Sequence, residues 1–317
     1  HGEVLTLGGN LGSSGVGALA ALHRELDNRV LVALAPSPRE ATSIEADLEA
    51  LLGAGASRYF PQREALPYEA SETHLEVGGL RVEALEAFFS GRTRLLVTTV
   101  RALQERGPVP ASLAELRLPL RKGAEPGFST LIRELEERGF EQVPLVEEVG
   151  QFAIRGGLID LFSFGSPDPL RVEFWGDEIT SIRTFEILDQ KSVRELELAH
   201  VLPVDFRRGE PGASVSRSLL ELLPSDSLFF HWVTEEWDGE GWKRDLHRTW
   251  SHAAEIRREL LEQGQDPEPV DHLFLSPSEA VETLETFPRI RVVPYRTGGL
   301  DLETEPPPAR SEEHTSE

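Results

Sequence analysis

Short apolar runs alternate with helical patterns through the first third of the chain, and this alternation limits the possible folds more than any other feature. Strands that alternate with helices build a parallel sheet with crossover helices, so an α/β fold is expected. Ser37 and Pro38 fit the N-cap and first position of a helix, and Gly53 fits its end. The runs span residues 4–7, 30–34, 57–60 and 94–100, and the helical patterns span 18–26, 38–52 and 74–89.

A similar alternation returns after about residue 203. Strands are predicted at 228–233, 272–276 and 289–295, and helices at 242–264 and 277–287. These elements are able to extend the first sheet, although periodicity alone leaves that open. The predicted division is an α/β part at 1–116, an inserted domain at 117–202, a second α/β part at 203–296 that completes the first, and a linker or tail at 297–317. The stretch from Gly107 to Pro110 marks the first boundary.

The predicted insertion contains a different pattern, an alternation with a period of two between Gln151 and Phe185. Leu170, Val172 and Phe174 alternate with Arg171, Glu173 and Trp175, and Phe152 and Ile154 alternate with Ala153 and Arg155. This period indicates half-buried antiparallel strands. Gly156-Gly157 indicates a bend, Gly176-Asp177 a hairpin turn, and the irregular run after it a bulge. An amphipathic helix at 128–140 is expected to pack on this sheet.

The face that each side chain takes decides what this sheet can bind. If Val172 and Phe174 point into the core, pleating sends Arg171, Trp175 and Arg155 to the opposite face. Trp and Arg are enriched at interaction hot spots, because one is a large rigid plane and the other a flat fork of donors. In the alternative interpretation Trp175 is covered by a helix and the arginines only solvate the sheet.

The charge and composition of the chain exclude several classes of protein. With 55 acidic against 32 basic side chains, the formal net charge is −23, which disfavours autonomous binding to DNA or RNA. The chain has no cysteine, so disulfides and thiolate ligands are excluded and a cytoplasmic location is expected. No run approaches the roughly 20 apolar residues of a membrane span, so no membrane partner is expected.

The glycine-rich stretch after the first run calls for a test as a nucleotide site. A P-loop needs a Lys for the phosphates and a Ser or Thr hydroxyl for magnesium. Those places fall on Ala18 and Leu19 in one register and on Gly15 and Val16 in another, and no lysine precedes Lys122. A loose dinucleotide fingerprint lacks the acidic residue that binds ribose. We therefore expect a degenerate P-loop without ATP hydrolysis.

Other groups with catalytic potential are more simply explained as structural. The carboxylate pairs Glu147-Glu148 and Asp177-Glu178 have no neighbouring His or third ligand in sequence. His231, His247 and His252 are not spaced as metal ligands. No catalytic residue, metal ligand or cofactor is therefore predicted.

Two ordered motifs, RGGLIDLF at 155–162 and LRVEFWGDEITSIRTF at 170–185, resemble a known domain. The domain is the small insertion shared by the excision-repair protein UvrB and the transcription-repair coupling factor family (Mfd), through which both bind UvrA. The flanks YFPQREALPYE, LLVTTVRAL and DQKSV are more similar to Mfd than to UvrB. The resemblance implies a RecA/UvrB-like α/β unit with a degenerate nucleotide site, split by the UvrA-binding domain.

The resemblance also implies partners and site residues. UvrA contacts are carried over to Arg155, Arg171 and Trp175, with adjacent Phe174 as the substitute for the aromatic position. The implied function is a non-catalytic module that recruits UvrA and links stalled transcription to nucleotide excision repair. In the family this face is masked by the C-terminal part, and RNA polymerase and DNA are bound by regions, including an ATP-dependent motor, that these 317 residues lack. The alternatives are a fragment of a UvrB-like nucleotide-dependent repair enzyme and a sequence-independent DNA-binding protein.

Overall fold

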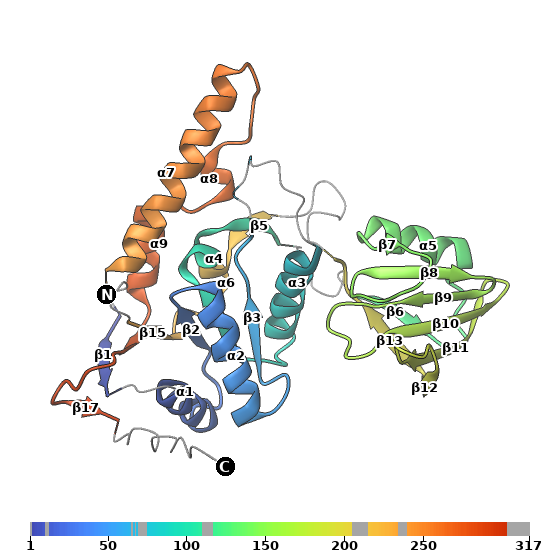
Figure 1. The fold of residues 1–317 in the computed structure, drawn as a ribbon, viewed down its shortest axis with the longest axis horizontal. Helices are drawn as coiled ribbons and strands as arrows, with labels where there is room; N and C mark the ends of the chain where they lie inside the picture. The colour runs from blue at the N-terminus through green and yellow to red at the C-terminus, as the bar shows by residue number, and fades with distance from the viewer. Residues whose placement is uncertain are drawn as a thin grey trace, which may run out of the picture.

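Two sheets of different kinds organise the chain. The computed structural model describes residues 2–9, 13–64, 66, 68, 75–109, 117–204, 215–233 and 240–302. In Figure 1 a seven-stranded sheet flanked by helices lies on the left, and a six-stranded sheet covered by one helix lies on the right. We call these parts the α/β unit and the inserted unit.

The seven-stranded sheet is parallel throughout, with strand order β17-β1-β16-β15-β2-β4-β3. It takes strands from both sides of the inserted unit, so the prediction of one split parallel sheet is confirmed. The domain boundaries themselves stay a prediction. The strands are β1 (Val4–Gly8), β2 (Leu31–Ala35), β3 (Ser57–Phe60), β4 (Leu95–Thr99), β15 (Leu228–Trp232), β16 (Arg289–Val292) and β17 (Leu300–Asp301).

Helices cover both faces of this sheet. In β2, Leu31 and Ala33 pack towards α1 and α2, whereas Val32 and Leu34 pack in the cluster formed by the helices of the other face. The helices are α1 (Ser14–Glu25) and α2 (Pro38–Leu52) on the first face, and α3 (Leu75–Phe89), α4 (Val100–Gln104), α6 (Leu219–Leu222), α7 (Gly241–Glu262) and α9 (Pro277–Thr286) on the second. As predicted, the Ser37 side chain caps α2 by accepting from the Glu40 N–H.

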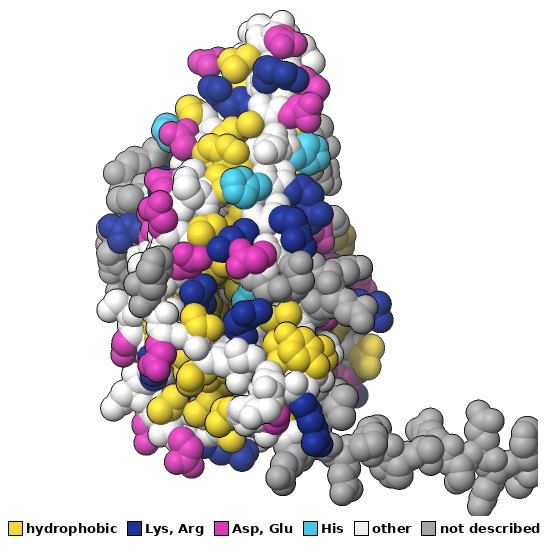
Figure 2. All heavy atoms as spheres, turned by 90° about the vertical axis from the view of Figure 1, so that its left-hand side faces the viewer, with side chains coloured by type: hydrophobic (Ala, Val, Ile, Leu, Met, Phe, Trp, Pro, Cys, Tyr) yellow, Lys and Arg dark blue, Asp and Glu magenta, His cyan; other side chains and the backbone are white. Residues whose placement is uncertain are grey.

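The β1–β17 end of the sheet is less well covered. Figure 2 looks onto this side of the molecule and shows apolar side chains gathered low on the face, among interspersed charges of both signs. The apolar side chains of Val4, Leu5 and Leu300 are 45%, 51% and 66% exposed. The strands at this end therefore expose apolar surface that the central strands bury.

The inserted unit is built on an antiparallel sheet with one parallel pair at its edge. Its strand order is β12-β11-β10-β9-β8-β7, and only β7 and β8 are parallel. The expected bulge is present, because Glu173 and Phe174 lie opposite Ser181 and Ile179, which leaves Thr180 as the extra residue. The strands are β7 (Glu141–Gln142), β8 (Gln151–Arg155), β9 (Leu158–Leu161), β10 (Leu170–Trp175), β11 (Glu178–Phe185) and β12 (Ser192–Leu196).

The helix α5 (Phe128–Glu137) covers one face of the antiparallel sheet. Leu131 and Leu135 of this helix are buried in one cluster with Phe152 and Val172 of the strands, as predicted. The chain leaves the helix through Gly139, whose φ of +90° suits glycine. On the other face of the sheet, the described residues form a small cluster at one end, which consists of Val146, Ala153 and Phe185 and their neighbours.

Two short antiparallel ribbons join the units. β5 (Arg106–Val109) pairs with β14 (Val215–Ser218), and β6 (Leu118–Arg121) pairs with β13 (Leu198–Val201). The expected boundary at Gly107 to Val109 therefore lies in a ribbon, and Pro110 lies outside the described residues. The chain thus enters and leaves the inserted unit along paired strands.

One expectation for secondary structure was wrong. Residues 272–276 do not form a strand, because α8 (Val270–Leu273) occupies the start of this stretch and Phe274 makes only an isolated bridge with Glu105. Phe274 is instead buried beneath α7 with Ala253 and Val270. Within the expected tail, β17 adds to the sheet beside β1, because the Asp301 carboxylate accepts from the Thr297 and Gly298 N–H groups and closes the preceding loop.

Candidate protein-interaction site

The open face of the antiparallel sheet carries the residues that the sequence singled out. Arg155, Arg171, Glu173 and Trp175 lie on the opposite side of the sheet from the core beneath α5. The burial of β10 alternates as expected, with Val172 buried and Trp175 exposed. The pleating of the strands thus brings these side chains to one surface.

Phe174, the substitute for the aromatic position, takes the covered face. Its side chain is 7% exposed, and its ring meets the ring of Phe128 edge-on with centroids 5.3 Å apart. Trp175, its neighbour, is 83% exposed at the start of the β10–β11 turn, where Gly176 has a φ of +62°. Trp175 is therefore the aromatic side chain that this turn presents to solvent.

A buried carboxylate, which the sequence analysis had not singled out, lies at the centre of the open face. Asp160 of β9 is 1% exposed and stands directly opposite Arg171 on β10 and Ala153 on β8. The Nε of Arg171 donates to Oδ1 of Asp160 at 2.7 Å and its Nη2 donates to Oδ2 at 3.0 Å. Such a two-point ion pair is both strong and fixed in geometry. The sequence does contain a sign of this buried carboxylate, because an acidic residue stands within the apolar run from Leu158 to Leu161 and a buried charge has to be paired.

The two predicted arginines have different surroundings. The side chain of Arg171 is 14% exposed, and its Nη1 also donates to the Gln190 carbonyl oxygen at 2.9 Å while the guanidinium lies 4.7 Å from the centroid of the Phe185 ring. Arg155 is 40% exposed and, within the part of the chain that the structure describes, donates only through Nη2, to Oδ2 of Asp160. Arg171 is thus held on every side, whereas Arg155 has N–H groups directed to solvent.

A second ion pair lies on the same face but is open to water. Arg183 of β11 donates through Nη2 to Glu173 at 3.1 Å and through Nε to the Ser181 hydroxyl at 2.9 Å. The side chains of Arg183 and Glu173 are 43% and 45% exposed. The two side chains of this pair are similar in exposure to Arg155, but the carboxylate of the pair is exposed rather than buried.

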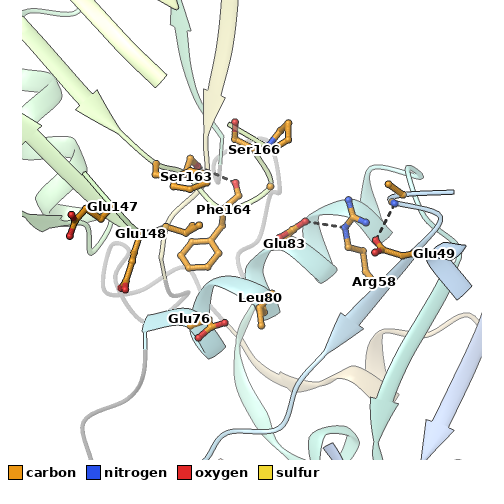
Figure 3. Close-up of a pocket in the computed structure, with 16 residues that line it drawn as sticks. Glu49, Arg58, Glu76, Leu80, Glu83, Glu147, Glu148, Ser163, Phe164 and Ser166 are labelled. Carbon is orange, nitrogen blue, oxygen red and sulfur yellow. Dashed lines mark hydrogen bonds and ion pairs between the residues drawn. The ribbon is translucent and has the colours of Figure 1, made fainter. Parts of the chain in front are cut away.

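A cleft of about 800 Å³ lies beside α3, between the α/β unit and the inserted unit. In Figure 3 the Phe164 ring points towards α3, and Glu147 and Glu148 lie on the side of the inserted unit. Glu83 of α3 pairs with Arg58 of β3 on the side of the α/β unit. A Cβ added at Gly79 would lie 2.1 Å from the Phe164 ring, so glycine permits this contact. The backbone N–H groups of Glu147 and Glu148 both donate to the Gln151 side chain, as in a turn.

The structure describes part of the glycine-rich stretch that the sequence predicts to be a degenerate P-loop. Residues 10–12 lie outside the described residues, and Ser13 donates its hydroxyl to the Asp47 carboxylate at 2.5 Å. Val16 and Leu19, at places where a P-loop carries functional side chains, are 3% and 0% exposed in the core. Among the described residues, no three His, Asp or Glu side chains converge as a metal site.

The open face of the antiparallel sheet offers hydrogen-bond donors and an aromatic plane, which suit recognition of an acidic surface.

Comparison with known proteins identifies the inserted unit. Residues 118–206 match the family described as the UvrB interaction domain. The transcription-repair-coupling factor of Mycobacterium tuberculosis (strain CDC 1551 / Oshkosh) is 34% identical over 176 residues, which is 53% of this chain and 14% of that protein. The chain is similar to transcription-repair-coupling factors over about half of its length. The coupling factor of Haemophilus influenzae is 30% identical over 195 residues, which is 61% of this chain and 17% of that protein. The coupling factor of Escherichia coli K12 is 32% identical over 140 residues, which is 44% of this chain and 12% of that protein.

This similarity confirms the resemblance seen in the sequence. The matches cover 12 to 17% of the coupling factors of these three organisms, so the chain corresponds to a small part of such a protein. The matched family includes the strands that carry Arg155, Arg171 and Trp175. In the part of the chain that the structure describes, no helix combines the length and the apolar character needed to cross a membrane.

Proposed function

We propose that this chain is a non-catalytic module of a transcription-repair coupling factor that recruits UvrA through the open face of its inserted unit. The observation that carries the proposal is the exposure of Arg155 and Trp175 on one face, within the residues that match the UvrB interaction domain. The name of that family supports a partner in the excision-repair system. The chemistry of the face supports a partner that presents carboxylates and an apolar recess.

Each side chain has its own role in this proposal. Arg155 pairs with an acidic group of UvrA through the N–H groups that Asp160 does not use. The indole of Trp175 fills an apolar recess, where a rigid ring loses little conformational freedom on binding. Arg171 contributes less binding energy than Arg155, because most of its N–H groups already donate to Asp160 and to the Gln190 carbonyl oxygen.

The remaining partners belong to parts of a coupling factor outside these residues. We propose that RNA polymerase and DNA are bound elsewhere in the full-length protein, that the protein works in the cytoplasm, and that its C-terminal part masks the open face until UvrA is needed. Masking predicts that full-length protein binds UvrA more weakly than this chain does. Equal affinities in parallel titrations would contradict it.

The test of the main proposal is a calorimetric titration of the chain with purified UvrA. We expect saturable binding that Arg155→Ala and Trp175→Ala each weaken by about 2 to 5 kcal/mol. The matched control is Arg133→Ala, because this arginine is 65% exposed on α5 and therefore lies away from the open face. Loss of binding in the control as well, or no binding by the folded chain, would contradict the proposal.

The same titration with ATP in place of UvrA tests the rival enzyme. We expect no saturable heat, since the P-loop lysine and hydroxyl are replaced in this sequence. A saturable ATP signal would favour a nucleotide-dependent repair enzyme instead.

A further inference from the structure

The buried carboxylate on the open face has two arginine partners, although one cation would neutralise it. Asp160 is 1% exposed, and a buried carboxylate is costly unless it is paired and hydrogen-bonded. Arg171 alone meets that need, because it binds both carboxylate oxygens and is itself covered by the Phe185 ring. The second partner, Arg155, therefore needs a further explanation.

Arg155 is placed where an unsupported side chain would move freely. It is the last residue of β8, directly before the turn at Gly156, whose φ is +62°. Long side chains at such exposed ends sample many rotamers, and binding has to restrict them. The contact between its Nη2 and Oδ2 of Asp160 restricts the guanidinium before any partner arrives.

The geometry leaves Arg155 able to bind while it is held. Of its five N–H groups, one Nη2 group donates to Asp160, and the side chain is 40% exposed. The cluster of Asp160, Arg155 and Arg171 also keeps one positive charge in excess, within a chain whose formal charge is −23. An acidic partner would therefore meet a fixed donor fork that carries an unneutralised charge.

We propose that Asp160 is a positioning residue for partner recognition, which presets the guanidinium of Arg155 for a carboxylate on the bound protein. This inference rests on the proposed function and deepens it, because it assigns the affinity of Arg155 to a buried residue that the partner never touches. Arg155 and Asp160 then act as one unit. The exposed pair of Arg183 and Glu173 lacks this arrangement, because its carboxylate is itself open to solvent.

The experiment is a double-mutant cycle with UvrA as the probe. We expect Asp160→Asn to weaken binding about tenfold, and to add less than about threefold when Arg155→Ala is already present. The matched control is the cycle of Glu173→Gln with Arg183→Ala, in which the carboxylate change alone should alter affinity less than about threefold. Unchanged affinity of Asp160→Asn, or full multiplication of the two effects in the first cycle, would overturn the inference.

Arg155→Lys keeps the test valid if Asp160→Asn fails to fold. This variant leaves Asp160 and Arg171 in place and keeps the charge, but an ammonium lacks the fork that can donate to Asp160 and to a partner in fixed directions. We expect affinity for UvrA to fall about tenfold while thermal unfolding stays close to that of the parent chain. Full affinity would show that charge alone is sufficient and would overturn the inference.

A measurement without UvrA separates this inference from the proposed function. Nuclear magnetic resonance of the arginine side chains should show a restricted Arg155 guanidinium in the parent chain and a mobile one in Asp160→Asn, with the exposed Arg133 of α5 mobile in both. Lack of UvrA binding together with this result would contradict the proposed function and leave the positioning intact. An Arg155 that is mobile in the parent chain would overturn the positioning whether or not UvrA binds.

Discussion

The two sheets of this protein differ in the number of faces that they bury. All five residues of β2, β4 and β15 are buried, whereas buried and accessible residues alternate in β10. A sheet with helices on both faces has no room for unpaired charge, and its polar side chains have to be neutral or paired. A sheet with one open face can carry arginines in its central strands, and there the candidate site lies. The same backbone geometry thus builds a fully buried sheet in one unit and a sheet with an open, charged face in the other.

The largest loss of stability is expected at Asp160, the buried carboxylate on the open face of the antiparallel sheet. Arg171→Ala leaves Asp160 buried with Arg155 as its remaining ion-pair partner, so the unfolding free energy should fall by about 3 to 5 kcal/mol. Arg183→Ala, on the same face, should cost at most about 1 kcal/mol because its pair is exposed. Chemical denaturation followed by circular dichroism measures both. Equal losses would mean that the open face does not distinguish buried from exposed ion pairs.

The closed sheet predicts a dependence of stability on pH. Burial, reinforced by the nearby charges of Arg291 and Arg289, lowers the pKa of His231 in β15 from 6.5 to about 3. Between these pH values the unfolded chain binds a proton that the native chain does not bind, so the unfolding free energy falls as the pH falls. The slope from this residue approaches about 1.4 kcal/mol per pH unit well below pH 6.5, which gives about 2 kcal/mol between pH 6.5 and 4.5.

His231→Gln should remove this slope, and His247→Gln on the exposed surface of α7 should leave it in place. Denaturation of the three proteins at a series of pH values separates this residue from the carboxylates, which respond alike in all three. A slope that persists in His231→Gln would show that this histidine is protonated in the native sheet.

The contact between the units predicts a smaller effect, with a sign that depends on the environment. Alanine is a better helix former than glycine by up to about 1 kcal/mol, so Gly17→Ala in α1 should stabilise the protein, because an added Cβ meets nothing within 4 Å. Gly79→Ala in α3 should instead destabilise it by about 1 to 3 kcal/mol, since the added Cβ would displace the Phe164 ring. Thermal unfolding measures the difference, and stabilisation by both changes would mean that this contact between the units is weak.

The smallest effect on stability is expected at the most exposed aromatic side chain. Trp175→Ala should change the unfolding free energy by no more than about 0.5 kcal/mol, because 83% of this side chain already faces solvent. Phe174→Ala, one residue away on the covered face, should cost about 3 to 5 kcal/mol. Similar losses at the two positions, measured by denaturation, would contradict the assignment of the two faces.

Several features were predictable from local pattern because their causes are local. The period of two placed Arg155, Arg171 and Trp175 on one face, and the fully apolar runs predicted strands covered on both sides. The caps of α2 followed from Ser37 and Pro38. The stretch at 272–276 misled because its alternation is also compatible with a helical turn followed by a buried Phe274, and packing under α7 selected that conformation.

The sequence by itself determined which side chains share a face, since that depends only on the alternation of a strand. It did not determine which of them are paired, because pairing depends on register between strands that lie apart in sequence. The register of β9 against β10 sets Asp160 opposite Arg171, and the β8–β9 turn brings Arg155 to the same carboxylate. Only that three-dimensional arrangement separates an arginine held on every side from one that can still bind a partner.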